Sequence, residues 1–169
     1  MAAGKPLGIQ PFGVEAQRIL RLEKAHVIIG QDTDGLTHPL EAGMNWAVKM
    51  DKPYFIGQRS LGILAGKPQT RRLAGFALSK DYSGPLPKEC HLVIDREDIE
   101  GRVTSVTHSP TLDRVIGMAY VSPAHSRPGT VIHIRVDGGE MIQASIVATP
   151  FYDPEGQRQI DVPVLQGVS

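Results

Sequence analysis

The sequence predicts an α+β chain that is mainly β, in which an N-terminal helical and extended segment precedes a small antiparallel sandwich or barrel of about six strands. Two observations support this prediction. Short apolar runs separated by turn residues dominate residues 69–150, whereas the clearest helical periodicity lies in residues 11–26. Hydrophobic residues make up 41% of the chain and charged residues 21%, so a packed core is expected rather than disorder.

Residues 11–26 are predicted to form an amphipathic helix. At about 100° per residue, the apolar side chains of Ala16, Ile19 and Leu20 fall within one sector, and Glu23 falls near the middle of that sector. The basic residues point elsewhere, which places them on the solvent-exposed face: Arg18, Arg21 and Lys24. A carboxylate that points inward needs hydrogen-bond donors or a cation. Glu23 is therefore the most unusual residue of the predicted helix.

The stretch that follows contains Asp32 and Asp34 in a pattern that is similar to the start of a calcium loop. An EF-hand loop that began at Asp32 would need a glycine at its sixth position and a carboxylate at its twelfth. Those positions hold Thr37 and Gly43. The sequence therefore predicts a polar turn, in which the aspartate side chains accept hydrogen bonds from nearby backbone N–H groups.

A second helix is predicted over residues 57–65, because Gly66 and Pro68 are stop signals. The strands are then expected within six runs: 71–79, 89–97, 101–109, 113–122, 130–137 and 140–150. Asp137-Gly138 predicts a hairpin between the last two runs, and Pro128-Gly129 predicts a type II turn before them. Beyond Pro150 we expect a surface arm or a frayed end.

Several classes of protein and site are disfavoured. The formal net charge is zero, which argues against nucleic-acid and polybasic membrane-surface partners. Cys90 is the one cysteine, so neither an internal disulfide nor a cysteine-based zinc site can form within the chain. No signal-peptide or membrane-spanning run is found, and a cytoplasmic location is expected. The six histidines form no helical ligand pair, so no metal site is expected: His26, His38, His91, His108, His125 and His133.

No catalytic constellation is complete. Cys90 has no recognisable partner pattern, and neither Ser60 nor Ser105 lies in a G-x-S-x-G motif. Neither a dinucleotide-binding glycine motif nor a Walker loop is found. Arg127 is open to two interpretations, a ligand contact or a surface cap beside its turn. No catalytic residue is therefore assigned.

Four segments, in order and at matching spacing, resemble the glycine-cleavage T-protein (aminomethyltransferase) superfamily: "RILRLEKAH", "TDGLTHPLEAGMNWAVKMDKPYFIGQRSL", "GRVTSVTHSPTLDRVIGMAYV" and "SRPGT". The amino-acid sequence of the second segment most resembles that of the folate-binding C-terminal half of sarcosine oxidase alpha subunits. The resemblance spans residues 8–150. It implies the end of a folate-binding domain in residues 1–68, the C-terminal β-barrel in residues 69–155, and a tail in residues 156–169.

The resemblance also implies tetrahydrofolate as cofactor, with flavin and NAD confined to other domains or subunits. In the family, an aspartate that acts at the reactive nitrogens of folate precedes the helix, and no counterpart is found in this sequence. We therefore expect a C-terminal fragment that is inactive by itself. Other subunits, or the N-terminal domains, are the expected partners.

The resemblance implies that Glu23 contacts the edge of the pterin ring that carries N–H groups. A fixed carboxylate can accept charge-assisted hydrogen bonds from these groups. From the residues alone, a buried ion pair with an arginine such as Arg59 is the alternative. Lys52 would meet the glutamate tail of folate, or else is an exposed loop lysine. Trp46 and Tyr54 would pack beside the pterin or benzoyl ring, or else belong to the core.

A rival interpretation is a non-catalytic β-barrel that docks on partners. It rests on the helix face with Ala16, Ile19, Leu20 and Glu23. If other domains normally cover this face, it is expected to be an exposed apolar patch in this chain. A homodimer formed through the same face would also hide it.

Overall fold

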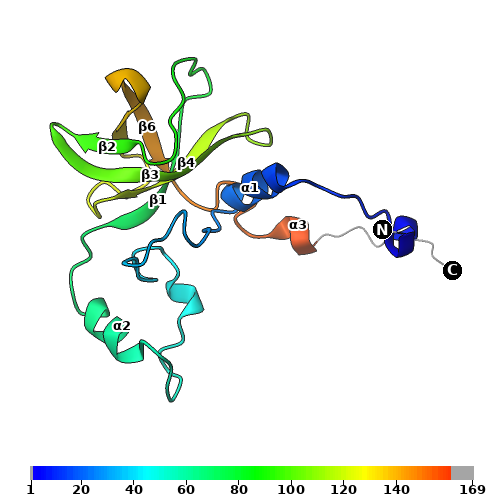
Figure 1. The fold of residues 1–169 in the computed structure, drawn as a ribbon, viewed down its shortest axis with the longest axis horizontal. Coiled ribbons are helices and arrows are strands. Elements are labelled where there is room, and N and C mark those ends of the chain that lie inside the picture. The colour runs from blue at the N-terminus through cyan, green and yellow to red at the C-terminus, as the bar shows by residue number, and fades with distance from the viewer. Residues whose placement is uncertain (1, 161–169) are drawn as a thin grey trace.

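The computed structural model describes residues 2–160, with a six-stranded β-barrel and short helical segments around it (Figure 1). The helical elements are η1 (Ala2–Leu7), α1 (Val14–Glu23), η2 (Asn45–Ala47), α2 (Gln58–Ala65), η3 (Asp137–Gly139) and α3 (Gln157–Ile160). The strands are β1 (Arg72–Ala77), β2 (Leu92–Asp95), β3 (Asp98–Ser109), β4 (Arg114–Val121), β5 (Val131–Arg135) and β6 (Met141–Val147). Residues 161–169, most of the expected tail, lie outside the described residues.

The six strands close into an antiparallel barrel in the order β1-β4-β3-β2-β5-β6, with β6 pairing back onto β1. This confirms the barrel that the family resemblance implied, whereas the strand pattern alone had also allowed a sandwich. Five of the six predicted runs each contain a whole strand, the run 101–109 holds most of β3, which begins earlier at Asp98, and both predicted helices form. The hairpin between β5 and β6 turns at Gly138, whose φ of 81° is a conformation that glycine adopts without strain.

Apolar side chains from every strand fill the barrel, as alternation along each strand requires. Phe76 on β1, Val103 on β3 and Ile134 on β5 are fully buried in this core. Almost the whole of β4 is buried, because its outer face is covered as well. The cover comes from the last turn of α1, where Leu22 packs against Ala77, Ile116 and Met118.

The contact between α1 and the barrel differs from the predicted helix face. Leu20 is 54% exposed, and Ala16 and Ile19 are half-buried, whereas Leu22 is 1% exposed. Only the C-terminal end of the helix reaches the barrel, so the position of that end decides which side chains are covered. The inward orientation of Glu23 is confirmed, since this residue is 2% exposed.

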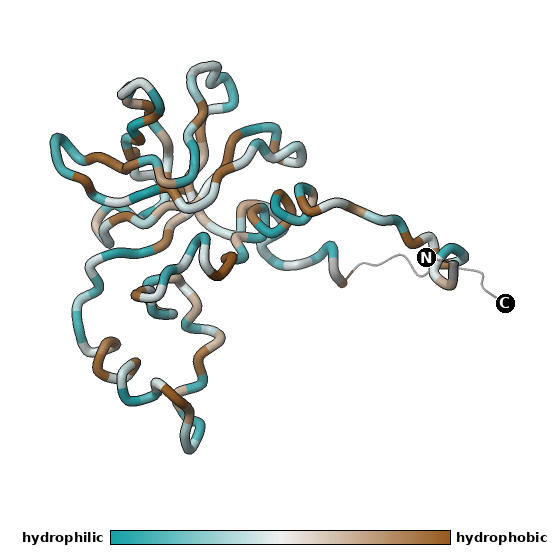
Figure 2. The backbone as a smooth tube through the Cα atoms, in the orientation of Figure 1, coloured by the Kyte–Doolittle hydropathy of each residue, from teal (hydrophilic) through white to brown (hydrophobic). Residues whose placement is uncertain are grey.

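Residues 43–71 form a lobe that extends away from the barrel and includes η2 and α2 (Figure 1). None of its side chains is buried, although several apolar residues lie along it (Figure 2). The lobe therefore has no core of its own. In the part of the chain that the structure describes, no helix is long and apolar enough to cross a membrane.

The barrel depends on close contact between backbones at Gly101, on β3. A Cβ atom added at this position would lie 1.8 Å from the carbonyl oxygen of Tyr120 on β4. We therefore expect Gly101→Ala to lower the free energy of unfolding by about 1–3 kcal/mol or more, as overpacking does, in urea denaturation. Gly35→Ala is the matched control, because nothing lies within 4 Å of its added Cβ. Equal stability of the two variants would contradict the observed packing.

Candidate functional site

The carboxylate of Asp32 lies between α1 and the barrel and is fully buried. Its Oδ2 atom accepts a hydrogen bond of 2.6 Å from Nη1 of Arg21 and one of 2.8 Å from the backbone N–H of Ile28. Its Oδ1 atom accepts hydrogen bonds from the hydroxyls of Thr104, at 2.7 Å, and Ser105 on β3. All the donors that a buried charge needs are therefore present, and they fasten the N-terminal segment to the barrel.

The predicted polar turn is present, but it explains only part of this arrangement. Asp34 is on the surface, and its Oδ1 accepts hydrogen bonds from the hydroxyl of Thr37 at 2.8 Å and the N–H of Leu36 at 3.0 Å. The hydrogen bond from Thr37, followed by that from Leu36, holds the pKa of Asp34 below its usual value. The helix-wheel placement of Arg21 in solvent was wrong, because its side chain is only 12% exposed and pairs with Asp32.

Glu23 does not pair with an arginine. Its Oε1 atom accepts a hydrogen bond of 2.5 Å from the hydroxyl of Ser109 at the end of β3. Arg59 is exposed on α2, so the predicted alternative of an ion pair between these two residues is wrong. The buried pair of an acid and an arginine belongs to Asp32 and Arg21 instead. Within residues 2–160, Ser109 is the one side chain that donates a hydrogen bond to this carboxylate of Glu23, and it does so at Oε1 and not at Oε2.

A largely apolar groove of about 280 Å³ begins two residues after Glu23 in the chain, and Glu23 itself does not line it. It is lined by Ala25, His26, Val27, Ala42, Gly43, Met44 and Trp46. Trp46 thus lies on a groove wall and is 74% exposed, and Tyr54 is 77% exposed, so the alternative of core packing is wrong for both residues. Tyr54 and Lys52 do not line the groove; both are exposed in the lobe.

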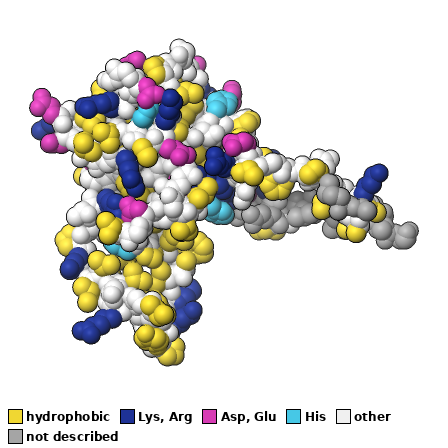
Figure 3. Space-filling view, in the orientation of Figure 1, with side chains coloured by type: hydrophobic (Ala, Val, Ile, Leu, Met, Phe, Trp, Pro, Cys, Tyr) yellow, Lys and Arg dark blue, Asp and Glu magenta, His cyan; other side chains and the backbone are white. Residues whose placement is uncertain are grey.

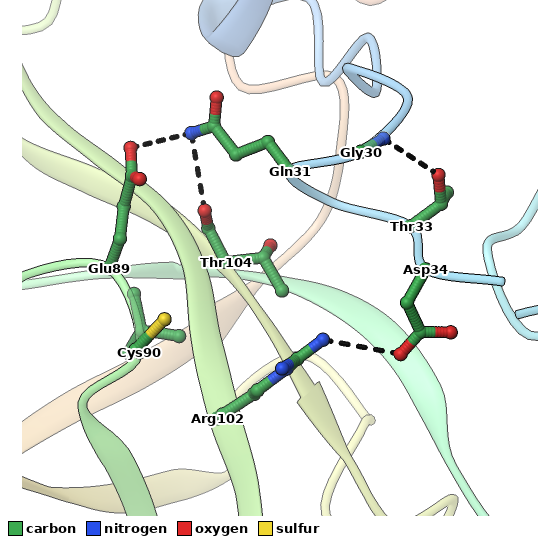
Figure 4. Close-up of a pocket in the computed structure, with 9 residues that line it drawn as sticks. Gly30, Gln31, Thr33, Asp34, Glu89, Cys90, Arg102 and Thr104 are labelled. Carbon is green, nitrogen blue, oxygen red and sulfur yellow. Dashed lines mark hydrogen bonds and ion pairs between the residues drawn. The ribbon is translucent and has the colours of Figure 1, made fainter. Parts of the chain in front are cut away.

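A second, more polar cleft of about 460 Å³ lies between the polar turn and β3 (Figure 4). The Nε2 atom of Gln31 donates to Glu89 at 2.6 Å, and Nη2 of Arg102 donates to Asp34 at 3.3 Å, so the charged groups already have partners. Cys90 is exposed in the cleft wall and has no hydrogen-bonded base among the described residues. The cleft offers polar contacts but no activated nucleophile.

Comparison with protein-family models matches both parts of the chain. The model of the glycine cleavage T-protein C-terminal barrel domain matches residues 71–153. The model of the GCVT N-terminal domain matches residues 1–52. Together the two matches include Glu23, the network around Asp32 and all six strands of the barrel.

Relatives of two kinds are found. The aminomethyltransferase of Halothermothrix orenii is 42% identical over 151 residues, which are 89% of this chain and 41% of that protein. The sarcosine oxidase subunit alpha of Corynebacterium sp. (strain P-1) is 35% identical over 165 residues, 94% of this chain and 17% of that protein. The crystal structure of the glycine cleavage system aminomethyltransferase T from Bartonella henselae superimposes with a TM-score of 0.77 at 28% identity, covering 90% of this chain and 43% of that one. The chain thus spans less than half of each relative.

The network around Asp32 predicts that substitutions of Asp32 and Asp34 lower the free energy of unfolding by very different amounts. Asp32→Asn would leave the guanidinium of Arg21 largely buried and unpaired, which we expect to lower the free energy of unfolding by about 3–5 kcal/mol. Asp34→Asn is the control, because it changes only surface contacts, which contribute about 0–1 kcal/mol. Chemical denaturation measures both variants. Similar losses in the two would show that the buried ion pair does not hold the segments together.

Proposed function

Because this chain belongs to the glycine-cleavage T-protein superfamily, we propose that it is the C-terminal part of a tetrahydrofolate-dependent enzyme subunit. The subunit transfers a one-carbon unit from an amine to tetrahydrofolate, as an aminomethyltransferase or as the alpha subunit of a sarcosine oxidase. The isolated chain is inactive in this proposal. Its relatives of both kinds extend well beyond the matched region, which covers 41% of the aminomethyltransferase and 17% of the sarcosine oxidase subunit.

The observation on which the proposal depends is the state of Glu23. This carboxylate is buried, is held in place by Ser109 through Oε1, and receives no side-chain hydrogen bond at Oε2 from the described residues. A fixed carboxylate of this kind accepts the N–H donors of a pterin edge in charge-assisted hydrogen bonds, and the low dielectric around it strengthens them. Glu23 therefore orients the pterin ring in our proposal, with no part in proton transfer.

Three further residues have smaller roles in this proposal. Trp46 contributes its ring to the groove after Glu23 and packs beside the pterin or benzoyl ring. Lys52 and Tyr54 belong to the lobe, where they are free to contact the tail of a folate that spans from the groove to the lobe. A lysine would form an ion pair with the glutamate tail as a point charge, because it cannot form the bidentate hydrogen bonds that arginine forms with a carboxylate.

We also propose a division of the chain into residues 1–68, the end of the folate-binding domain, and residues 69–155, the barrel domain. The two family models support this division, since their boundary falls between residues 52 and 71. The lobe supports it as well, because none of its side chains enters the barrel core.

The chain also has an apolar surface that a docking function would use. Phe12, Val14 and Leu20 on and before α1 are 54–70% exposed, and so are several residues of the lobe: Trp46, Tyr54 and Ile56 at 74%, 77% and 91%. Apolar side chains lie over this lobe in Figure 3. Extended apolar surface of this kind marks an interface. We assign it to the rest of the folate-binding domain, rather than to a second copy of the chain.

The role of Glu23 is tested by calorimetric titration of 5-formyltetrahydrofolate into the chain at millimolar ligand. We expect weak binding that Glu23→Gln lowers at least tenfold, because one charge-assisted hydrogen bond contributes about 1.5–3 kcal/mol. Glu15→Gln is the control, because Glu15 is exposed in the first turn of α1. Equal affinities for wild type and Glu23→Gln would remove Glu23 from a folate site.

The assignment of the apolar surface is tested by co-purification. The partner is the region of the Halothermothrix orenii aminomethyltransferase that this chain does not match. We expect the chain to co-purify with it, and Tyr54→Ser combined with Ile56→Ser to weaken the complex at least tenfold. Ile99→Ser is the control, since Ile99 is 67% exposed on the barrel. If the control weakens the complex as much as the double variant does, the lobe is not the interface.

A further inference from the structure

Two carboxylates and one imidazole converge at one end of the barrel, away from Glu23. Asp95 ends β2, Glu100 lies on β3, and His125 belongs to the loop between β4 and β5. One ligand atom from each of the three side chains lies within 4.8 Å of the other two. Three separate chain segments therefore place potential metal ligands around one point.

The cluster has an excess of negative charge. Glu100 is largely buried, with its side chain 9% exposed, and accepts hydrogen bonds from Nδ1 of His125 at 2.5 Å and from the N–H of Ser122 at 3.1 Å. Asp95 forms no side-chain hydrogen bond or ion pair with any described residue. Neither carboxylate is paired with a lysine or arginine among residues 2–160. Two carboxylates this close repel each other unless a cation lies between them.

A small cavity lies at the same place. Its volume is about 20 Å³, and its walls include Asp95, Glu100, His125 and His133. A space of this size holds one water molecule or one ion and nothing larger. His133, on β5, adds a second imidazole to the cavity wall, beyond the three converging groups. The three converging side chains thus border a cavity of ionic size, and Asp95 on its wall has no hydrogen-bond or ion-pair partner among residues 2–160.

We propose that this cluster binds one divalent transition-metal ion of the zinc type, through Asp95, Glu100 and His125. An imidazole nitrogen with two carboxylate oxygens is a ligand set that Zn²⁺, Co²⁺ and Mn²⁺ accept. Calcium and magnesium favour sites made of oxygen alone. The ion balances the two carboxylates and does not belong to the folate chemistry.

Binding needs only a local movement. Zinc lies about 2.0–2.2 Å from nitrogen and oxygen ligands, so the atoms of His125 and Glu100 that now share a hydrogen bond must separate by roughly 1 Å. His125 lies on a loop and its side chain is 35% exposed, which permits this rotation. The ion would then fasten the loop between β4 and β5 to the hairpin of β2 and β3.

The experiment uses the whole chain after treatment with a chelator. ZnCl₂ is titrated by calorimetry, and the visible absorption of added Co²⁺ reports its coordination. The variants are Asp95→Asn and His125→Asn, with His108→Asn as control. His108 is an exposed histidine near a single carboxylate, Asp113, at 3.8 Å. Asp95→Asn replaces a carboxylate that forms no hydrogen bond or ion pair with any described residue by an amide of the same shape, so we expect the fold to stay intact, and thermal unfolding in chelator checks this.

We expect one equivalent of Zn²⁺ to bind, an intense Co²⁺ spectrum, and an affinity at least tenfold lower in both cluster variants but unchanged in the control. Metal is also expected to raise the unfolding temperature of the wild type and not that of Asp95→Asn. The proposal is overturned if no saturable binding occurs, if the control loses as much affinity as Asp95→Asn, or if only Ca²⁺ or Mg²⁺ binds.

Discussion

The buried carboxylate of Asp32 is the contact that joins the two parts of this molecule. It accepts hydrogen bonds from Arg21 and Ile28 on the N-terminal side and from Thr104 and Ser105 on β3. Because a buried charge tolerates little displacement of its donors, the end of α1 has one position on the barrel. The position of Glu23, two residues after Arg21, follows from that constraint.

The two parts differ in how they are stabilised. The barrel closes on itself, so it has a core and no open sheet edge. The lobe from residue 43 to residue 71 has no buried side chain and exposes residues such as Trp46 and Ile56. A segment of this kind is stable in a native protein when something covers it. This difference is the reason for our proposal that the lobe is covered by another part of a larger unit.

Two of the chain's acidic groups illustrate how environment decides the role of a carboxylate. Asp32 is saturated with donors, including a cation, and its role is structural. Glu23 is also buried but has a single side-chain donor, Ser109, and this difference is the reason for the ligand-binding role that we propose for it. The cluster of Asp95, Glu100 and His125 is a third case, in which two carboxylates meet a histidine and, among the described residues, no lysine or arginine. These differences arise from the neighbours, because the acidic groups themselves are chemically alike.

The sequence alone determined the strands, the two helices, the hairpin at Gly138 and the inward orientation of Glu23, because alternation, stop signals and turn residues act over a few neighbouring positions. Tertiary structure decided that β6 pairs with β1 to close a barrel, and that Arg21 turns inward to meet Asp32. It also decided that Trp46 and Tyr54 stay exposed, and that Asp95 and Glu100 meet His125. Each of these outcomes depends on contacts between segments that are distant along the chain. Local sequence patterns do not indicate which distant segments will be in contact.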